Sequence, residues 1–335
     1  MKKNINIFSK GYENKTNYSS LVKSKTNNNL KIIKTKKKQE SLPNNFDLID
    51  EFSNNNEINK NPIKSYEDVI TKNLFIDEIK NRANYKNLFV NNSTLSYYKR
   101  ITCVNWFMLI TVEFNLREEC FYLMINIFDR YIEKISNQKK ILRKNEHKLI
   151  VITCAFIAAK YEEIYPPELE DFARLTCEGV QKIDILNMET DILEKLDYEL
   201  HIISQLVFLN KFYYDLKTEL SPIILYGAQF ILDLCLFEPE FCELKPSCEA
   251  AVSLFLAKKF LFNKNNVWNG KCNYVTGYKD VEIKKNIKIP LETLKKFFNN
   301  DFVENYENIT LYRKYSNQQY MNVVEIFRKK FTSNI

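Results

Sequence analysis

The feature that most constrains this chain is its scarcity of glycine, with only five in 335 residues. Average usage of roughly 7% would place about 23 glycines in a chain of this length. Turn-rich sheets depend on glycine, whereas the leucine, isoleucine, phenylalanine and lysine that are abundant here suit long helices. Apolar residues make up 45% of the chain, which is enough for a sizeable core. The composition therefore predicts an all-α fold of one large domain or two ordinary ones.

The same composition excludes several kinds of catalytic site. The five glycines are too scattered to build G-x-G-x-x-G or a similar phosphate loop, which argues against a nucleotide-binding enzyme. His147 and His201 are the only histidines, too few for a multi-histidine metal site or for histidine acid–base chemistry. Glu162 and Glu163 are adjacent on a predicted helix and point to different sides, so they form no carboxylate pair. We therefore expect no catalytic residues, no metal and no cofactor.

Cysteines and apolar stretches indicate the environment of the chain. Eight cysteines are spread from Cys103 to Cys272 without a C-x-x-C pair, so a structural zinc site is not indicated. Most lie inside apolar runs, as is typical of buried thiols in a reducing compartment. The N-terminus lacks the apolar region of a secretory signal, and no apolar run of about 18 residues occurs. We expect a soluble intracellular chain that has no membrane partner.

The net charge of +7 is unevenly distributed along the chain. Residues 1–60 contain twelve lysines, no arginine and six acids, so the other 275 residues carry a net charge of only +1. A folded surface that binds nucleic acid directly is therefore not expected. Low complexity and isolated apolar residues predict that residues 1–61 form a disordered tail. Its basic stretch Lys31–Lys38 is compatible with a nuclear import signal and with a plain solvated tail, and we expect a nuclear and cytoplasmic protein, with the nucleus favoured.

Hydrophobic periodicity predicts two sets of helices after the tail. An amphipathic N-terminal helix and a linker occupy 62–90, with Tyr66 and Ile70 on the apolar stripe of the helix. The predicted helices of the first set, within 95–200, span 98–114, 117–135, 147–163, a short one from Pro167, and 180–196. The stretch 147–163 is so apolar that it belongs at the centre of a bundle. The predicted helices of the second set, within 201–335, span 204–216, 222–237, 247–262 and 291–306, with mostly loop over 263–290.

Several segments together resemble one known family. The string KYEEIYPPE at 160–168 resembles the most characteristic segment of A/B-type cyclins. Further segments are similar to cyclin landmarks in the same order: KRITCVNW at 99–106, IFDRY at 127–131, ILNME at 185–189, Trp268, TGY at 276–278 and YSNQQY at 315–320. The resemblance covers about residues 62–327. It implies two tandem five-helix cyclin folds, which are preceded by an N-terminal helix and the disordered tail.

The resemblance implies a regulatory subunit and not an enzyme. A cyclin binds a cyclin-dependent serine/threonine kinase as a heterodimer and activates it allosterically in cell-cycle control. A cyclin partner of a transcriptional kinase is an alternative, and so, with less support, is a cyclin-fold general transcription factor. The transcription factor would need a basic DNA-facing surface, which the nearly neutral folded part does not indicate.

The resemblance also implies which residues contact the kinase. Lys160 and Glu189 match the two charged contacts of the family. The residues that match its apolar contacts are Ile157, Tyr161, Leu193 and Tyr198. From the residues alone, Lys160 and Glu189 would be solvated, and core packing remains open for Ile157 and Leu193.

A buried ion pair is implied as well. Arg100 and Asp129 match two positions that cyclins pair between the first and second helices of the box. An apolar bundle tolerates a buried arginine only when its charge is paired, which agrees with this assignment. The residue-level alternative is that both are surface charges.

The cyclin groove that docks Arg-x-Leu motifs of substrates and inhibitors is divergent in this sequence. Trp106 and Leu149 fit the family pattern, whereas Lys99, Cys103 and Ile150 depart from it. Leu109 also replaces a glutamate that would pair with the arginine of the motif, and Lys99 adds an opposing charge. We therefore expect impaired docking of Arg-x-Leu ligands. The tail contains no R-x-x-L and the chain no K-E-N, so the usual degradation signals of mitotic cyclins are missing from this sequence.

Overall fold

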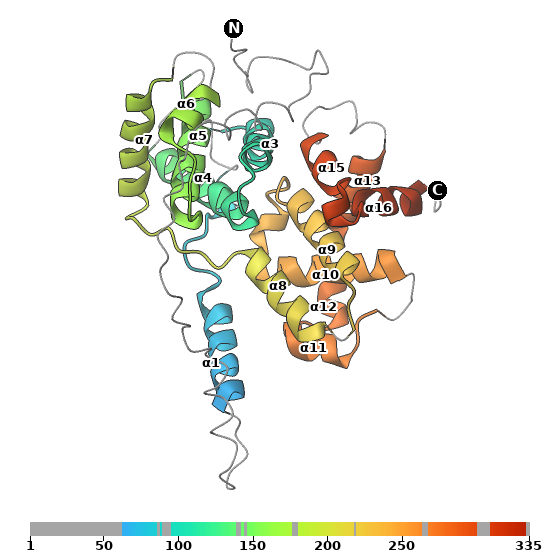
Figure 1. Cartoon of the computed structure of the whole chain (residues 1–335). Coiled ribbons are helices and arrows are strands. Elements are labelled where there is room, and N and C mark those ends of the chain that lie inside the picture. The colour runs from blue at the N-terminus through green and yellow to red at the C-terminus, as the bar shows by residue number, and fades with distance from the viewer. Residues whose placement is uncertain are drawn as a thin grey trace, which may run out of the picture. The chain divides into compact units, whose positions relative to one another are not determined.

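The computed structural model describes residues 62–85, 88, 95–138, 142–143, 146–175, 180–217, 219–262, 267–299 and 309–332. The predicted disordered tail and the basic stretch within it lie outside these residues. The regular structure of the described ranges is entirely helical, which confirms the predicted fold class (Figure 1). The first helix, α1, spans Pro62–Asp77. The compact unit that carries the remaining helices begins at Asn73, inside α1.

The first set contains the five predicted helices, and most of their ends lie within a few residues of the predicted ones. They are α3 Tyr97–Glu113, α4 Glu118–Asn137, α5 Glu146–Glu162, α6 Leu169–Leu175 and α7 Lys182–Lys195. Helix α3 begins after Ser96, whose side chain accepts a hydrogen bond from the backbone N–H of Lys99 at 3.3 Å. Helix α5 is the centre of this set, because residues 150–159 are all buried and the helix packs against the other four. The apolar run therefore occupies the position that its composition predicted.

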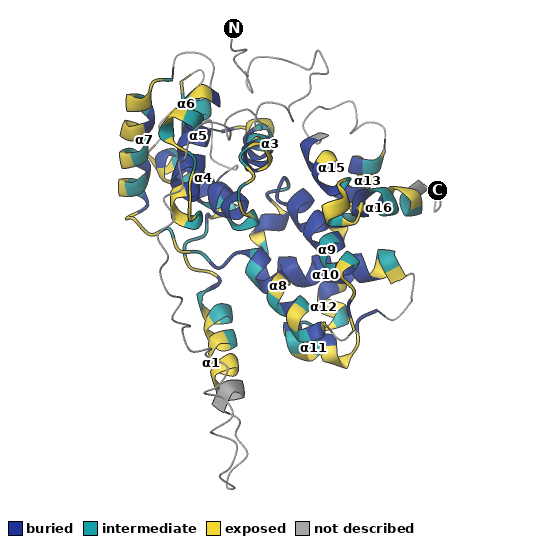
Figure 2. Cartoon of the chain, viewed as in Figure 1, coloured by how far each residue is buried: buried dark blue, intermediate teal, exposed yellow. Residues whose placement is uncertain are grey.

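The second set has a similar centre but more helices than predicted. Its elements are α8 Gln205–Leu216, α9 Pro222–Cys235, η3 Phe241–Glu243, α10 Pro246–Phe262, α11 Gly270–Thr276, α12 Asp280–Lys285, α13 Lys288–Phe298, α15 Ile309–Tyr315, η5 Gln318–Tyr320 and α16 Val323–Thr332. Helix α10 is buried from Pro246 to Lys258 and lies beside α9 (Figure 2). These two helices form the core of the second set.

The predicted loop over 263–290 is wrong in part, because α11, α12 and the first turn of α13 fall within it. Local capping explains α11: the Asn269 side chain accepts from the backbone N–H of Cys272 at 2.9 Å, and Gly277 ends the helix with φ 76°. Helices of six or seven residues are too short to show a hydrophobic period in a Lys-rich stretch. The predicted helix 291–306 starts earlier, at Lys288, and its part from 300 onward lies outside the described residues. Helices α15 and α16 were not predicted.

A buried polar network joins the two sets of helices. Asp233 on α9 accepts hydrogen bonds from the hydroxyls of Tyr122 at 2.5 Å and Tyr315 at 2.7 Å, and from the Lys314 ammonium at 2.8 Å. Lys314 also pairs with Glu118 on α4 at 2.5 Å. Although burial opposes the charge of Lys314, the carboxylates of Asp233 and Glu118 raise its pKa. Every buried charge here has a partner, so the network fixes how α4, α9 and α15 meet.

The segment 78–85 forms a second connection between the sets. Arg82 donates to the backbone carbonyls of Cys242 and Leu244, both at 2.6 Å, and lies 3.4 Å from the carboxylate of Glu249. On the other side, the backbone N–H of Asn84 donates to Glu133 of α4 at 3.1 Å. The segment therefore ties the start of α10 to the first set.

Glu249 is a buried carboxyl at this connection, and its charged form is unfavourable there. Burial raises its pKa to about 8, and the charge of Arg82 and the hydrogen bond from Gln205 at 2.8 Å oppose that shift only in part. Below pH 4.5 the carboxyl is protonated in the folded and the unfolded chain. Between about pH 4.5 and 8 the unfolded chain releases this proton and the folded chain retains it, so the stability contributed by this group falls as pH rises.

We predict that Glu249→Gln makes the free energy of unfolding less dependent on pH. Relative to the variant, the natural chain should lose up to about 1.4 kcal/mol per pH unit between pH 5 and 8. Urea denaturation at several pH values measures this difference, and Glu292→Gln, which removes an exposed carboxylate, serves as the control. Parallel pH profiles for the natural chain and Glu249→Gln would contradict the prediction.

Candidate functional site

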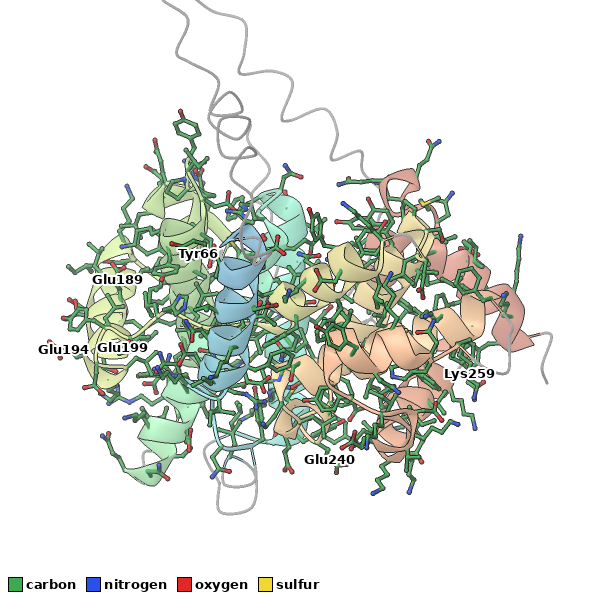
Figure 3. All side chains as sticks on the ribbon, turned by 90° about the horizontal axis from the view of Figure 1, so that it is seen from below. Tyr66, Glu189, Glu194, Glu199, Glu240 and Lys259 are labelled. Carbon is green, nitrogen blue, oxygen red and sulfur yellow. The ribbon has the colours of Figure 1, made fainter. Side chains whose placement is uncertain are left out.

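The predicted charged contacts, Lys160 and Glu189, are brought together by the packing of α5 against α7. Their side chains form an ion pair, and the Lys160 ammonium also lies 4.3 Å from the centre of the Phe156 ring. Lys160 is 43% exposed and Glu189 is 12% exposed. Figure 3 shows Glu189 at the edge of the molecule, with Glu194 farther along the same helix. The pair therefore lies at the surface, where a partner can reach it.

Two exposed tyrosines lie at the ends of the helices that carry this pair. Tyr161 follows Lys160 at the end of α5 and is 49% exposed, and Tyr198 is 65% exposed. Asp197 and Tyr198 both have left-handed backbone angles, φ 54° and 58°, which are uncommon for residues other than glycine. The backbone N–H of Tyr198 donates to the Leu193 carbonyl at 2.9 Å, so the turn that ends α7 holds this tyrosine outward. Leu193 itself is half-buried against the core.

Ile157 does not belong to this surface. It is 2% exposed and packs within the core of the first set, which is the core-packing alternative that the sequence left open, and its contact with a kinase stays a prediction. The position lies on the inner side of α5, which the sequence could not determine because nearly every residue of that helix is apolar. We call the other five residues, Lys160, Tyr161, Glu189, Leu193 and Tyr198, the Lys160 face.

Sequence reasoning missed two exposed apolar residues beside this face. Ile164 and Tyr165, just after α5, are 84% and 92% exposed. The segment before them is held by Arg117, whose backbone N–H donates to the Glu163 carboxylate at 2.7 Å. The sequence contained a signal for their exposure. Both residues directly precede the prolines at 166 and 167, which indicate a loop between helices, and such loops lie at the surface. They extend the apolar part of the exposed region around Tyr161.

Arg100 and Asp129 form a bidentate ion pair in which both side chains are fully buried. The guanidinium donates to the two carboxylate oxygens at 2.9 and 2.8 Å. Its third contact is the Leu236 carbonyl at 2.9 Å, and the Tyr85 hydroxyl donates to Asp129 at 3.0 Å. Although burial opposes the charge, Asp129 raises the pKa of Arg100. The pair thus links α3, α4, the segment 78–85 and the second set, and it has no exposed part that could bind a ligand.

The residues of the predicted docking groove are only partly at the surface. The Trp106 ring stacks on His147 with a centroid distance of 5.6 Å and an interplanar angle of 10°, and Lys99 is exposed. Leu149 is half-buried. Cys103 and Ile150 are fully buried in the core, and their assignment to the docking groove stays a prediction. The replacements at these two positions therefore alter packing and not an exposed lining.

Other chemical features of the described residues are limited. Seven cysteines are free and buried, and burial raises the pKa of Cys248 to about 12, which keeps this thiol protonated. Within the described ranges, no cluster of three or more histidine, cysteine, aspartate or glutamate side chains is arranged to hold a metal ion. None of the described helices combines the length and the apolarity needed to cross a membrane.

Comparison with known proteins identifies the family of this chain. Two family models match, the cyclin N-terminal domain over residues 69–201 and the cyclin C-terminal domain over 203–329. A viral cyclin from herpesvirus saimiri, solved by X-ray crystallography, has a similar fold with a TM-score of 0.58 and 20% identity. The match covers 67% of this chain and 96% of the viral one. It supports the fold assignment.

Sequence relatives agree with these matches. The G2/mitotic-specific cyclin-B of Dictyostelium discoideum is 29% identical over 59% of this chain and 44% of its own length. Cyclin-A1-4 of Oryza sativa subsp. japonica is 29% identical over 64% of this chain and 60% of its own length. The chain thus spans about half the length of these relatives. Because both domain models match in order and the relatives are A- and B-type, the chain belongs to the cyclin family, as an A/B-type cyclin with two cyclin boxes.

Proposed function

We propose that this chain binds a cyclin-dependent kinase through the Lys160 face and activates it as a regulatory subunit in cell-cycle control. The observation that supports the proposal is the partly exposed Lys160–Glu189 ion pair, together with the exposed rings of Tyr161 and Tyr198 at the ends of the same two helices. Aromatic anchors beside charged groups are typical of the few residues that dominate binding energy at protein interfaces. All catalytic residues would belong to the kinase.

The proposed mechanism is allosteric. The bound cyclin would hold the C-helix of the kinase inward, so that the helix glutamate pairs with the catalytic lysine, and it would open the activation loop. Moving a kinase from about 1% to 99% active requires roughly 5.5 kcal/mol of preferential binding to the active state. Partly exposed pairs such as Lys160–Glu189 stabilise a free protein by only about 1 kcal/mol or less. If Lys160 and Glu189 separate and pair with charges on the kinase instead, the free energy lost by breaking their own pair is therefore small.

We predict that the double variant Lys160→Ala plus Glu189→Ala activates the kinase at least about tenfold less than the natural chain, because the loss of about 1.4 kcal/mol of binding has that effect. The measurement is histone phosphorylation by kinases that the tagged chain captures from its own cells. Replacing both residues avoids a variant in which Lys160 or Glu189 remains without its partner in the cyclin. The loss of activation then reports the missing contacts with the kinase.

The control for this experiment is the Lys271→Ala plus Glu219→Ala variant. These residues form an exposed pair at 3.6 Å in the second box, and Lys271 is 42% exposed, close to the value for Lys160. The control should activate the kinase normally. If the natural chain activates no kinase, the proposed function fails, whereas undiminished binding by the Lys160 and Glu189 variant would refute only the assigned interface.

Cell-cycle control is favoured over the two alternatives. The matching relatives carry A- and B-type names, and one of them is named as G2/mitotic-specific. The nearly neutral charge of the chain after residue 60 gives no support to a DNA-bound transcription factor. We also propose that the protein acts mainly in the nucleus, for which the support is the basic stretch Lys31–Lys38 of the sequence.

A further inference from the structure

A buried lysine and a buried cysteine contact each other in the second box. Lys258 on α10 is 5% exposed, Cys272 on α11 is fully buried, and the Lys258 ammonium donates a hydrogen bond to the Cys272 sulfur at 3.2 Å. The ammonium also lies 5.9 Å from the centre of the Trp268 ring. Lys314, the only other buried lysine of the described residues, pairs with two carboxylates. Lys258 differs from Lys314 in that its hydrogen-bond acceptor is a thiol sulfur.

One carboxylate senses the charge of Lys258 from a greater distance. Glu219 is partly exposed, and its carboxylate accepts a hydrogen bond from Asn269 at 3.0 Å and pairs with Lys271 at 3.6 Å. The hydrogen bond from Asn269 lowers the pKa of Glu219, and the charges of Lys271 and Lys258 lower it further. Glu219 is thus bound to other partners at the surface, and Cys272 is the group that Lys258 contacts directly.

The sulfur of Cys272 also differs from those of the other described cysteines in what it contacts. The Cys120 sulfur lies 3.1 Å from the Glu163 carboxylate, and burial and that carboxylate raise the pKa of Cys120. Among the seven cysteines in the described part of the chain, Cys272 alone accepts a hydrogen bond from a lysine. Because the proton of this bond lies between nitrogen and sulfur, the pair can react as thiolate with ammonium or as thiol with amine. The thiolate is the form that attacks peroxides.

We propose that hydrogen peroxide converts this pair into a covalent sulfenamide that links Lys258 to Cys272. The Cys272 thiolate attacks one peroxide oxygen, so that an S–O bond forms, the O–O bond breaks, and the released hydroxide takes a proton from the Lys258 ammonium. The neutral amine then attacks the sulfur of the sulfenic acid, an S–N bond forms, and the S–O bond breaks as the oxygen leaves in a water molecule with a proton from the nitrogen. In total the pair loses two electrons and two hydrogen atoms, and one hydrogen peroxide becomes two water molecules.

The position of the pair suits this reaction. Nitrogen and sulfur are already 3.2 Å apart, and α11 has only seven residues, so a local opening of this helix admits a molecule as small as hydrogen peroxide. The link would join residues 14 positions apart, and like a disulfide it would restrict the unfolded chain. The oxidised chain should therefore hold α11 more firmly against α10 and melt at a higher temperature. A thiol reductant should reverse the link.

Peptide mapping by mass spectrometry, after the full chain is treated with hydrogen peroxide, tests this inference. We expect a linked pair of peptides that contain Lys258 and Cys272, lighter by two hydrogen atoms than the two separate peptides, and loss of the link after dithiothreitol. Lys258→Leu removes the amine, so it should abolish the link and leave a sulfenic acid at Cys272 that dimedone traps. Cys272→Ser should lose both the link and the rise in melting temperature on oxidation, which keeps the test decisive if Lys258→Leu does not fold.

Two matched variants serve as controls. Lys259→Leu changes the next residue of α10, which is exposed and is labelled in Figure 3, and Cys120→Ser removes the thiol that faces a carboxylate. Both should form the link as the natural chain does. A link through Lys259, a Cys272 that carries oxygen but no link, or a link that retains an oxygen atom would each overturn the inference. Kinase activation is not part of the readout, so failure of the proposed function would leave this result unchanged.

Discussion

Replacing Asp129 with alanine should lower the free energy of unfolding by about 3–5 kcal/mol, because it leaves the charge of Arg100 buried without its partner. Arg100 is fully buried, and two of its three described hydrogen bonds go to Asp129. The variant also removes the acceptor of the Tyr85 hydroxyl. Urea denaturation followed by circular dichroism measures the change as a shift of the unfolding midpoint at unchanged slope.

The control is Asp215→Ala, which breaks the partly exposed Lys211–Asp215 pair within α8 and should cost about 1 kcal/mol or less. A second variant, Arg100→Met plus Asp129→Leu, replaces the buried pair with apolar side chains. It should be more stable than Asp129→Ala, because no unpaired charge remains. If Asp129→Ala and Asp215→Ala destabilise the chain equally, the pair is not the buried connection that the structure describes.

Replacing Asp233 with alanine should have an effect of similar size, about 3–5 kcal/mol, and should act on the junction between the boxes. The change removes the acceptor of two buried tyrosine hydroxyls and one of the two carboxylates that compensate Lys314. Because Tyr122 belongs to the first box and Tyr315 to the second, we expect the boxes to lose their mutual stabilisation. Limited proteolysis near 196–204, between α7 and α8, should become faster, in addition to the drop in thermal stability.

A double variant distinguishes the loss of charge pairing from a loss of packing. Asp233→Leu plus Lys314→Met removes the buried anion and cation together, and it should be more stable than Asp233→Ala. In this variant the Glu118 carboxylate still accepts the hydrogen bond from the Tyr320 hydroxyl at 2.6 Å. Because Glu118 is also partly exposed, its charge remains solvated without Lys314. If the double variant is no more stable than Asp233→Ala, packing around the tyrosines, and not the charge of Asp233, stabilises the junction.

The helices with a clear hydrophobic pattern were predictable from sequence. The apolar stretch at 147–163 became the central helix α5, and the second and fifth helices of the first set were found with nearly correct ends. The short helices α11 and α12 were missed, because seven and six residues carry little periodicity and their ends depend on caps. The resemblance to cyclins supplied pairs that periodicity cannot supply, such as Arg100 with Asp129.

Which apolar residues face outward could not be predicted in the same way. Ile157, Cys103 and Ile150 match family positions at contact surfaces and are buried in this chain, whereas Ile164 and Tyr165 are exposed and were not assigned. On a helix that is apolar all round, the hydrophobic pattern does not tell which side a neighbour covers. Only the packing of α3, α4 and α7 against α5 decides this.

The sequence by itself determined an all-α chain with two sets of helices, a central apolar helix in the first set, and a basic segment ahead of them. These properties follow from composition and local periodicity, which act over a few residues. Only the tertiary structure decided that Lys160 and Glu189 pair with each other, that Asp233 lies at the junction of the two boxes, and that His147 stacks on Trp106. Lys314 and Asp233 are 81 residues apart, and Tyr320 and Glu118 are 202 apart. Contacts over such separations depend on how whole helices pack, which no local pattern in the chain encodes.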